Sequence, residues 1–444
     1  MKKSMFVYYT YTDDGSLVMI NTYKGTDSIF KVSDNKKEKV LNWLNGQLSG
    51  LDEDFYKLKE YGYFIDDDVD EKLLRELSYN ESRMDSNLHL VIHVTERCNF
   101  RCTYCGLDFE NCEDLSDDMQ DAIIKYIARN IKKYNSVILD WFGGEPTLRI
   151  DIIEKISNKV SEICKRAKKP LFSTITTNGY LLTTTNVQRL LQCGVYKYVI
   201  TLDGLKENHN KMRVLEGGKG TYDVILNNLK NMSKNVQRHF EVWIRTNMTI
   251  KNSTEEYLTE YYDYYNEIFG KDARFSLFAR PTNDLGGERV EEIRDALLGN
   301  NNQTMSEIIK TLSENSKDMI YKGNMRDLNV GGCRCPASRL NKYNILVDGT
   351  INKCDDGEHS RYSIGKLLKD GTMDIKDSIH ARWLFNNATD RNEKCDDCAF
   401  SMICNMDGCP KYRIATGRTH CPLKREEFES SLLLWAVQDD TKIL

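Results

Sequence analysis

Between residues 88 and 278, six short apolar runs alternate with longer stretches whose apolar residues recur at helical spacing. The runs lie at 89–94, 137–142, 171–177, 196–202, 241–250 and 274–278. Strands that alternate with helices pack as a parallel sheet with right-handed crossovers, which is either open or closed into a full or partial barrel. The functional site of such a fold lies at the carboxyl ends of the strands, so the residues after each run are the candidates for chemistry.

This pattern divides the chain of 444 residues into three regions. Residues 1–87 combine short alternating segments with helices, which predicts either a winged-helix-like module or an N-terminal cap on the main domain. Residues 88–324 form the α/β region. Residues 325–444 contain few long apolar runs and many cysteines, so we expect metal clusters to stabilise them.

Composition limits the partners and the compartment. The formal charge of -5 comes without a long Lys/Arg block, which argues against nucleic acid as a partner. No apolar run is long enough to span a membrane. The first residues make a poor signal peptide, so the 14 cysteines predict reduced thiolates in the cytoplasm rather than disulfides.

Three cysteines follow the first strand-like run in one loop, at Cys98, Cys102 and Cys105. Three thiolates on a short loop suit three corners of a four-iron cubane and leave the fourth iron open to a small chelating ligand. A zinc site would normally need a fourth Cys or His close by. The spacing therefore favours an iron–sulfur cluster.

This loop and the strand-helix series resemble the radical S-adenosylmethionine (SAM) superfamily. The resemblance implies that the open iron binds SAM, and that an electron from the cluster cleaves SAM to a 5'-deoxyadenosyl radical that abstracts a hydrogen atom. It also implies a partial (β/α)6-type barrel and an external one-electron donor such as flavodoxin or ferredoxin. The cofactor does the difficult chemistry in such enzymes, and the protein directs it.

A Gly-Gly-Glu-Pro motif follows the second run, at Gly143, Gly144, Glu145 and Pro146. It looks like the family's motif for gripping the amino group of SAM. Glycines let the backbone approach a ligand closely, and Glu145 is an acceptor for an ammonium donor.

Later strand ends carry further candidates for SAM contacts. Asn178 and Thr201 resemble ribose and carboxylate contacts, although Asn-Gly and Asp-Gly pairs at these places are also ordinary turn dipeptides. Tyr104 is expected to pack on adenine or simply within the loop. Arg245 is a candidate contact of the methionine or ribose part of SAM.

The last region resembles the SPASM extension of radical SAM enzymes, which is loop-rich and holds two auxiliary clusters. The resemblance assigns the first cluster Cys333, Cys335, Cys354 and Cys409, and the second Cys395, Cys398, Cys404 and Cys421. One departure is that four residues, rather than three, separate Cys404 from Cys409, which we interpret as a loop insertion. Cys333 or Cys335 is either a ligand of the first cluster or a spare cysteine. The alternative to two iron–sulfur clusters is a pair of zinc-ribbon-like sites. Together with the cluster predicted at the upstream cysteine loop, the two auxiliary clusters give a predicted total of three [4Fe-4S] clusters.

The leading functional hypothesis is modification of a ribosomally made precursor peptide, with formation of a thioether or carbon–carbon cross-link. Enzymes with the SPASM extension chiefly modify peptides and proteins, and the N-terminal module is expected to bind the precursor's leader as an added strand. Asp355 is a candidate base, by resemblance to sulfatase-maturating enzymes. Formylglycine formation on a sulfatase and a non-catalytic, metal-stapled binding or electron-transfer protein are the alternatives.

Overall fold

The computed structural model describes most of the chain. The described residues are 1–12, 14–107, 109–110, 112–235, 239–282, 288–298, 308, 311, 320–321, 335–354, 362–385, 395–404, 409–418, 425–436 and 442–444. Cys333, Asp355 and Cys421, three of the candidate site residues, lie outside them.

Six parallel strands stand side by side in chain order, as the alternating pattern predicts. They are β6 (Asn87–His93), β8 (Ser136–Phe142), β9 (Leu171–Thr177), β10 (Lys197–Thr201), β12 (Glu241–Met248) and β13 (Phe275–Pro281). Because each strand lies beside the next one in the chain, the crossover helices all lie on one face, and the sheet curves into a partial barrel. The predicted α/β class and partial barrel are confirmed.

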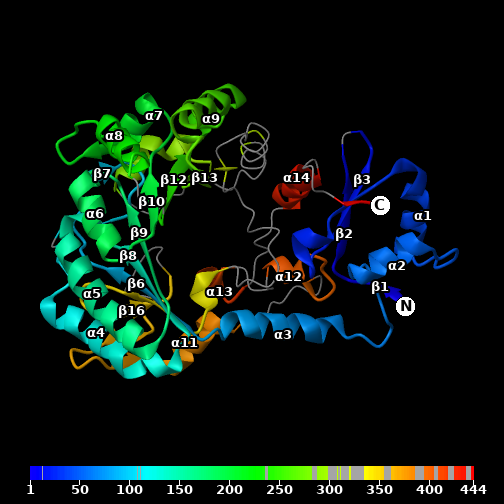
Figure 1. Cartoon of the computed structure of the whole chain (residues 1–444), viewed down its shortest axis with the longest axis horizontal. Coiled ribbons are helices and arrows are strands. Elements are labelled where there is room, and N and C mark those ends of the chain that lie inside the picture. The colour runs from blue at the N-terminus through cyan, green and yellow to red at the C-terminus, as the bar shows by residue number, and fades with distance from the viewer. Residues whose placement is uncertain are drawn as a thin grey trace.

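Helices cover the outer face of this sheet, where Figure 1 shows them in an arc around the strands. They are α4 (Asp117–Asn130), α5 (Ile150–Ala167), α6 (Thr184–Gln192), α7 (Lys206–Met212), α8 (Tyr222–Ser233) and α9 (Glu255–Phe269). Side-chain caps begin several of them: Ser116 accepts from the Met119 amide and Thr183 from the Asn186 amide. Their apolar faces form one continuous core with the strands.

The sheet continues beyond β6 into the cysteine-rich region. β15 (Lys342–Ile345) pairs parallel to β6, and three antiparallel strands follow. These are β16 (Thr350–Asn352), β17 (Gly365–Leu367) and β18 (Met373–Ile375). At the opposite edge, β14 (Ile320–Tyr321) pairs with β13. Helices α11 (Asp377–Leu384) and α13 (Pro410–Thr416) contact each other in the same region.

Residues from both ends of the chain build a second, smaller unit, which we call the N-terminal module. Its sheet has the order β19-β4-β3-β2. The strands are β2 (Val7–Tyr11), β3 (Leu17–Asn21), β4 (Phe30–Val32) and β19 (Lys442–Ile443), and the helices are α1 (Asp34–Leu44) and α2 (Glu53–Glu60). Helix α1 begins at Asp34, directly after Ser33, which stands at the N-cap position in extended conformation. A short pair, β1 (Lys2–Lys3) with β5 (Phe64–Ile65), lies beside it.

The module's sheet has an apolar cluster on each side. Phe30 and Val32 belong to one cluster with residues of α1 and α2. Val18 and Ile20 belong to the other, which contains Phe400 and Phe428 from the far end of the chain. Phe400 lies in the segment 395–404, just before α12 (Ser401–Cys404), and Phe428 lies in α14 (Arg425–Ala436). Residues expected in a third region therefore complete the N-terminal module.

Helix α3 (Glu71–Arg83) runs between the module and the barrel (Figure 1). The remaining short elements are the 3-10 helices η1 (Gly25–Ser28), η2 (Ile131–Lys133), η3 (Pro146–Arg149), η4 (Ile250–Asn252), η5 (Glu288–Ala296) and η7 (Pro336–Ser338). No helix within the described residues is both long and apolar enough to cross a membrane.

Candidate active site

The three-cysteine loop follows β6 at the carboxyl edge of the barrel sheet. Part of the loop forms β7 (Phe100–Cys102), which pairs antiparallel with β11 (Arg213–Leu215). The register sets Cys102 directly opposite Arg213. Two more backbone bonds fasten the loop to the same segment: Thr103 donates to the Met212 carbonyl (3.0 Å) and Glu216 to the Asn99 carbonyl (3.1 Å). These backbone bonds fasten the cysteine loop to β11 and the residues around it.

Burial controls the ionisation of the three thiols. It raises the pKa of Cys98 to about 12, with the Glu145 carboxylate adding to the shift, and that of Cys102 to about 11. The pKa of Cys105 is also raised by burial. Cluster assembly must then displace thiol protons, as binding of metal to thiolates requires. The nearby Arg213 guanidinium favours the thiolate of Cys102. Three buried thiols on one loop and one buried cation fit a cluster held by Cys98, Cys102 and Cys105.

In the part of the chain that the structure describes, no three His, Cys, Asp or Glu side chains converge where a single metal ion would bind. In a four-iron cubane each thiolate instead binds a different iron, so the cysteines need not meet at one point.

The two glycines of the Gly-Gly-Glu-Pro motif pack against the start of the cysteine loop. A Cβ atom on Gly143, whose φ is +127°, would lie 2.3 Å from the Thr95 carbonyl oxygen, and one on Gly144 would lie 2.3 Å from the Arg97 carbonyl oxygen. The Gly144 amide donates to the Thr95 carbonyl (2.8 Å) and the Glu145 amide to that of Arg97 (2.9 Å). The glycines thus let the two loops touch backbone to backbone, a role that the sequence interpretation did not include.

Glu145 ties the ends of β8 and β9 together. Its buried carboxylate accepts hydrogen bonds from the Thr177 hydroxyl (2.6 Å), the Asn178 amide (2.7 Å), and the amide (3.0 Å) and hydroxyl of Thr147. Burial raises its pKa, while these donors oppose the rise. Most of its acceptor capacity is therefore used within the protein, and its predicted contact with the ammonium of SAM stays a prediction.

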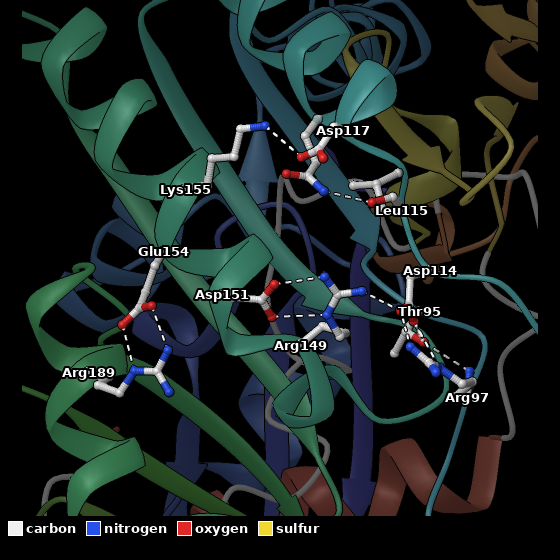
Figure 2. A network of polar contacts seen from close by, with 11 residues as sticks. Thr95, Arg97, Asp114, Leu115, Asp117, Arg149, Asp151, Glu154, Lys155 and Arg189 are labelled. Carbon is white, nitrogen blue, oxygen red and sulfur yellow. Dashed lines mark hydrogen bonds and ion pairs between the residues drawn. The ribbon is translucent and has the colours of Figure 1, made fainter.

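Asp114 joins the two loops from the outside (Figure 2). It accepts from the Thr95 hydroxyl (2.6 Å) and from Arg97 Nε (3.0 Å), at the start of the cysteine loop. It also pairs with Arg149, which ends η3 just after the Gly-Gly-Glu-Pro motif and forms a second ion pair with Asp151 (2.7 Å). Although burial alone would raise the pKa of Asp114, these donors lower it. One carboxylate thus fixes the relative position of both loops.

Tyr104 is the centre of a buried polar network rather than only a flat packing surface. Its hydroxyl donates to Asp203 Oδ2 (2.5 Å) and accepts from Arg213 Nη1 (2.5 Å) and Asn247 Nδ2 (2.8 Å). Asn247 also donates to Asp203 Oδ1 through its amide nitrogens on backbone (2.9 Å) and side chain (3.0 Å). Three strand ends therefore hold the residue that precedes Cys105.

His209 supports this network in one defined tautomer. The Asp203 amide donates to its Nδ1 (3.0 Å), so Nε2 carries the proton and donates to the Thr221 hydroxyl (2.9 Å). That hydroxyl donates in turn to the Arg213 carbonyl (2.8 Å). Burial, and the charge of Arg213, lower the pKa of His209 well below its usual range. The histidine is neutral and positions Asp203 and Arg213.

The other predicted SAM contacts lie at the same edge of the sheet. Asn178, after β9, donates to Asn99 Oδ1 in the cysteine loop (2.8 Å). Thr201 ends β10, is buried, and is paired in register with Arg245 of β12. Arg245 donates through Nε to Asn247 (3.3 Å), which connects it with the Tyr104 network. Pro146 is buried at the start of η3.

Residues 92–265 match the model of the radical SAM superfamily. The match runs from β6 to α9 and so includes the cysteine loop, the Gly-Gly-Glu-Pro motif and the strand ends described above. These residues form a radical SAM domain. The superfamily is one of enzymes, and it agrees with the family predicted from the cysteine loop.

Curated relatives match different shares of the chain. The Fe-coproporphyrin III synthase of Methanosarcina barkeri is 31% identical over 147 residues, which is 32% of this chain and 33% of the synthase. The chain thus matches about a third of that relative's length. A cysteine-type anaerobic sulfatase-maturating enzyme of Clostridium novyi is 22% identical over 351 residues, which is 73% of this chain and 88% of the enzyme.

Solved structures extend the likeness beyond the radical SAM domain. The sulfatase-maturating enzyme anSMEcpe with bound AdoMet has a TM-score of 0.58 at 18% identity and covers 79% of this chain and 96% of its own. SuiB of Streptococcus suis, bound to S-adenosylmethionine, has a TM-score of 0.50 at 17% identity and covers 94% of this chain and 97% of its own. These likenesses show a shared fold.

The described C-terminal cysteines lie in two separate places. Cys335 and Cys354 flank the β15–β16 hairpin and contact the barrel core. Cys395 and Cys398 precede α12, in which Cys404 is buried, whereas Cys409 is exposed at the start of α13. The assignment of these residues to two auxiliary clusters stays a prediction.

The sequence interpretation did not include Asp114, nor the network that joins Asp203, His209, Arg213 and Asn247. Asp114 lies in a loop with no motif, so no sequence signal marks it. The position of Asp203, Arg213 and Asn247 at or after strand ends was the available signal, because such residues converge on one edge.

Proposed function

We propose that this chain is a radical SAM peptide maturase, which modifies a ribosomally made precursor peptide by forming a thioether or carbon–carbon cross-link. The observation that carries the proposal is the fixed cysteine loop, locked to the Gly-Gly-Glu-Pro loop by backbone hydrogen bonds at the strand ends of a radical SAM domain. The likeness in fold to SuiB over 94% of the chain supports a module beside the barrel that serves the same chemistry.

In this proposal Cys98, Cys102 and Cys105 hold a [4Fe-4S] cluster whose open iron takes SAM. When bound, the pair supplies reductive cleavage of SAM and a radical that abstracts hydrogen from the peptide. The residues of this chain position the groups and exclude water. Glu145 supplies negative charge near the thiols, and the buried Arg213 supplies positive charge beside Cys102.

Several finer points belong to the same proposal. Two auxiliary [4Fe-4S] clusters would use the C-terminal cysteines. The chain would be divided into functional units at residues 1–87, 88–324 and 325–444. A flavodoxin or ferredoxin would supply the electron in the cytoplasm, and Asp355 would act as the base. The peptide partner is supported by the likeness in fold to anSMEcpe with bound AdoMet and Cp18Cys peptide.

The test combines the reconstituted protein with a candidate precursor peptide, SAM and a reductant under anaerobic conditions. We expect a peptide lighter by two hydrogens that does not react with a hydrazide probe for aldehydes. An unchanged peptide mass in the presence of active SAM cleavage would contradict the proposal for that peptide class.

Formylglycine formation is the second candidate, because the sulfatase-maturating enzyme of Clostridium novyi matches 73% of this chain. It predicts a hydrazide-reactive product on a sulfatase peptide. Deletion of residues 1–87 is a poor discriminator, since it would expose Phe400 and Phe428, which pack on the module. The aldehyde assay separates the two candidates without disturbing the fold.

A further inference from the structure

The outer edge of β4 is covered by a short strand from the far end of the sequence. β19 pairs parallel with β4, with Lys442 opposite Phe30 and Ile443 opposite Lys31. The Leu444 amide donates to the Lys31 carbonyl (3.0 Å). An extended chain therefore already occupies the edge at which another peptide could add as a strand.

Ser33 completes this pairing at the end of β4. Its amide (3.3 Å) and its hydroxyl (2.8 Å) both donate to the Leu444 carbonyl. Since Ser33 also stands at the N-cap position of α1 without a side-chain cap bond, its hydroxyl is available for this contact. The edge thus offers a side-chain donor in addition to the backbone ladder.

Alternate side chains of this strand meet different surroundings. Leu444 is 4% exposed and belongs to the apolar cluster beneath α1 and α2, whereas Ile443 is 70% exposed. Lys442 donates to the Asp27 carbonyl (2.6 Å), and its ammonium lies 5.0 Å from the centre of the Tyr61 ring. The edge therefore accepts a large aliphatic side chain and, two residues earlier, a long basic one.

Helix α2 contacts the other side of this strand. Lys57 donates from Nζ to the Ile443 carbonyl (3.4 Å). The strand is thus held between β4 and α2 mainly through its main-chain atoms, and such contacts depend little on sequence. Another peptide that carries an aliphatic side chain at the position of Leu444 can make the same contacts.

The strand can leave without disturbing the rest of the module. Phe428 and Leu432 of α14 are buried in the cluster on the opposite side of the sheet. They do not belong to the cluster that contains Leu444. Opening only three residues at a sheet edge breaks few contacts, and local openings of this size are the ones that folded proteins sample most readily.

We propose that the β4 edge binds an extended peptide, and that residues 442–444 occupy it as an internal competitor which the incoming peptide displaces. The identity of that peptide as a precursor leader rests on the proposed function. A tethered segment competes at an effective concentration of order mM, so if residues 442–444 bind the edge with an intrinsic dissociation constant of about 0.1 mM, an incoming peptide binds the intact chain roughly tenfold more weakly.

A fluorescein-labelled peptide with the sequence of residues 438–444 is the probe, and fluorescence anisotropy is the measurement. We expect the full chain carrying Leu444→Asp, and a chain lacking residues 442–444, to bind the probe roughly tenfold more tightly than the unmodified chain. Ile443→Asp is the matched control, because its side chain points to solvent on the same strand, and it should bind like the unmodified chain. A probe with Asp in place of its last Leu should not bind.

Hydrogen exchange at the Ser33 amide checks that the fold persists. We expect faster exchange in Leu444→Asp and restored protection with saturating probe. Equal probe affinity in all four proteins, or equal binding of the Asp probe, would overturn the proposal. The assay contains no SAM and no precursor, so failure of the maturase proposal would leave its result unaffected.

Discussion

The barrel site and the N-terminal module are stabilised in different ways. In the barrel, each functional segment follows its own strand, and side chains such as Glu145 and Asp114 then tie neighbouring segments together. In the module, the sheet is completed by residues about 400 positions away, namely α14 on one face and β19 at one edge. The barrel site is therefore built from successive strands, whereas the module depends on long-range contacts that a peptide can exchange.

Removing the long-range contact of α14 should have the largest effect. Phe428 is 1% exposed, and its ring centre lies 4.7 Å from that of Phe400 and 5.6 Å from that of Tyr8. Phe428→Ala should lower the free energy of unfolding by about 4 kcal/mol. Hydrogen exchange should show the loss in β3 and leave the barrel strands protected. The control Phe172→Ala, at a ring 43% exposed on β9, should cost about 1 kcal/mol. Equal losses would remove the distinction between the regions.

A methyl group between the two site loops should have the next largest effect. Gly144→Ala places a Cβ within 2.6 Å of three backbone atoms of Glu96 and Arg97, so the loops must separate. We expect a loss of about 3 kcal/mol in chemical denaturation. Gly217→Ala is the control, because nothing lies within 4 Å of its Cβ. A Gly144→Ala protein as stable as the control would show that the loops do not touch.

Acid should weaken the barrel side first. Burial, with Lys353 nearby, lowers the pKa of His380 on α11 to about 4. The unfolded chain binds this proton below about pH 6.5 and the folded chain only near pH 4, so stability should fall by about 2 kcal/mol as pH drops through that interval. Residues 1–87 contain no histidine, so the module lacks this response. Urea denaturation across the interval measures the slope. His380→Gln should reduce the slope by the share of His380 and leave the share of His209, whose pKa burial also lowers. An unchanged slope would contradict the assignment.

Loss of the Asp114 charge should have the smallest of these effects. Asp114→Asn should cost about 1 kcal/mol at pH 7, because both arginine partners are partly exposed. The pKa of Asp114 is lower in the folded chain than in the unfolded chain. The stability difference between the wild type and Asp114→Asn is therefore present above about pH 4 and shrinks as the pH falls through the pKa of Asp114 in the folded chain. Asp151→Asn, at a side chain 60% exposed on the same arginine, is the control and should change stability by less than about 0.5 kcal/mol. A pH-independent difference would exclude the ion pairs as its cause.

The barrel could be predicted from the sequence because its signals are local. The apolar run at 171–177 gives β9 with the observed bounds, and the convergence of strand ends follows from parallel topology. The pairing of β7 with β11 could not be predicted, since three residues carry no periodicity and the partner lies 111 positions away, from Cys102 to Arg213. The pairing of β19 with β4 could not be predicted for the same reason, because β19 is also short and distant in sequence from its partner.

The residues of the cluster loop could be predicted from the sequence, whereas the hydrogen bonds and contacts that hold the site together could not. Spacing identified Cys98, Cys102 and Cys105, because the required thiolates lie in one loop. The glycines at 143 and 144 were expected at a ligand, yet their nearest atoms are the backbone of the cysteine loop. Sequence reveals which residues a site needs, and only the folded chain shows which neighbours hold them.

Reductive cleavage of SAM tests the central claim most directly. The protein, reconstituted anaerobically with iron and sulfide and then reduced, is incubated with SAM, and 5'-deoxyadenosine is measured by chromatography. The account predicts that the unmodified chain forms 5'-deoxyadenosine, whereas Cys102→Ala loses it and Cys193→Ala, a buried cysteine on the outer side of the barrel at the end of α6, retains it. Absence of 5'-deoxyadenosine from the unmodified chain, or its undiminished formation by Cys102→Ala, would contradict the account.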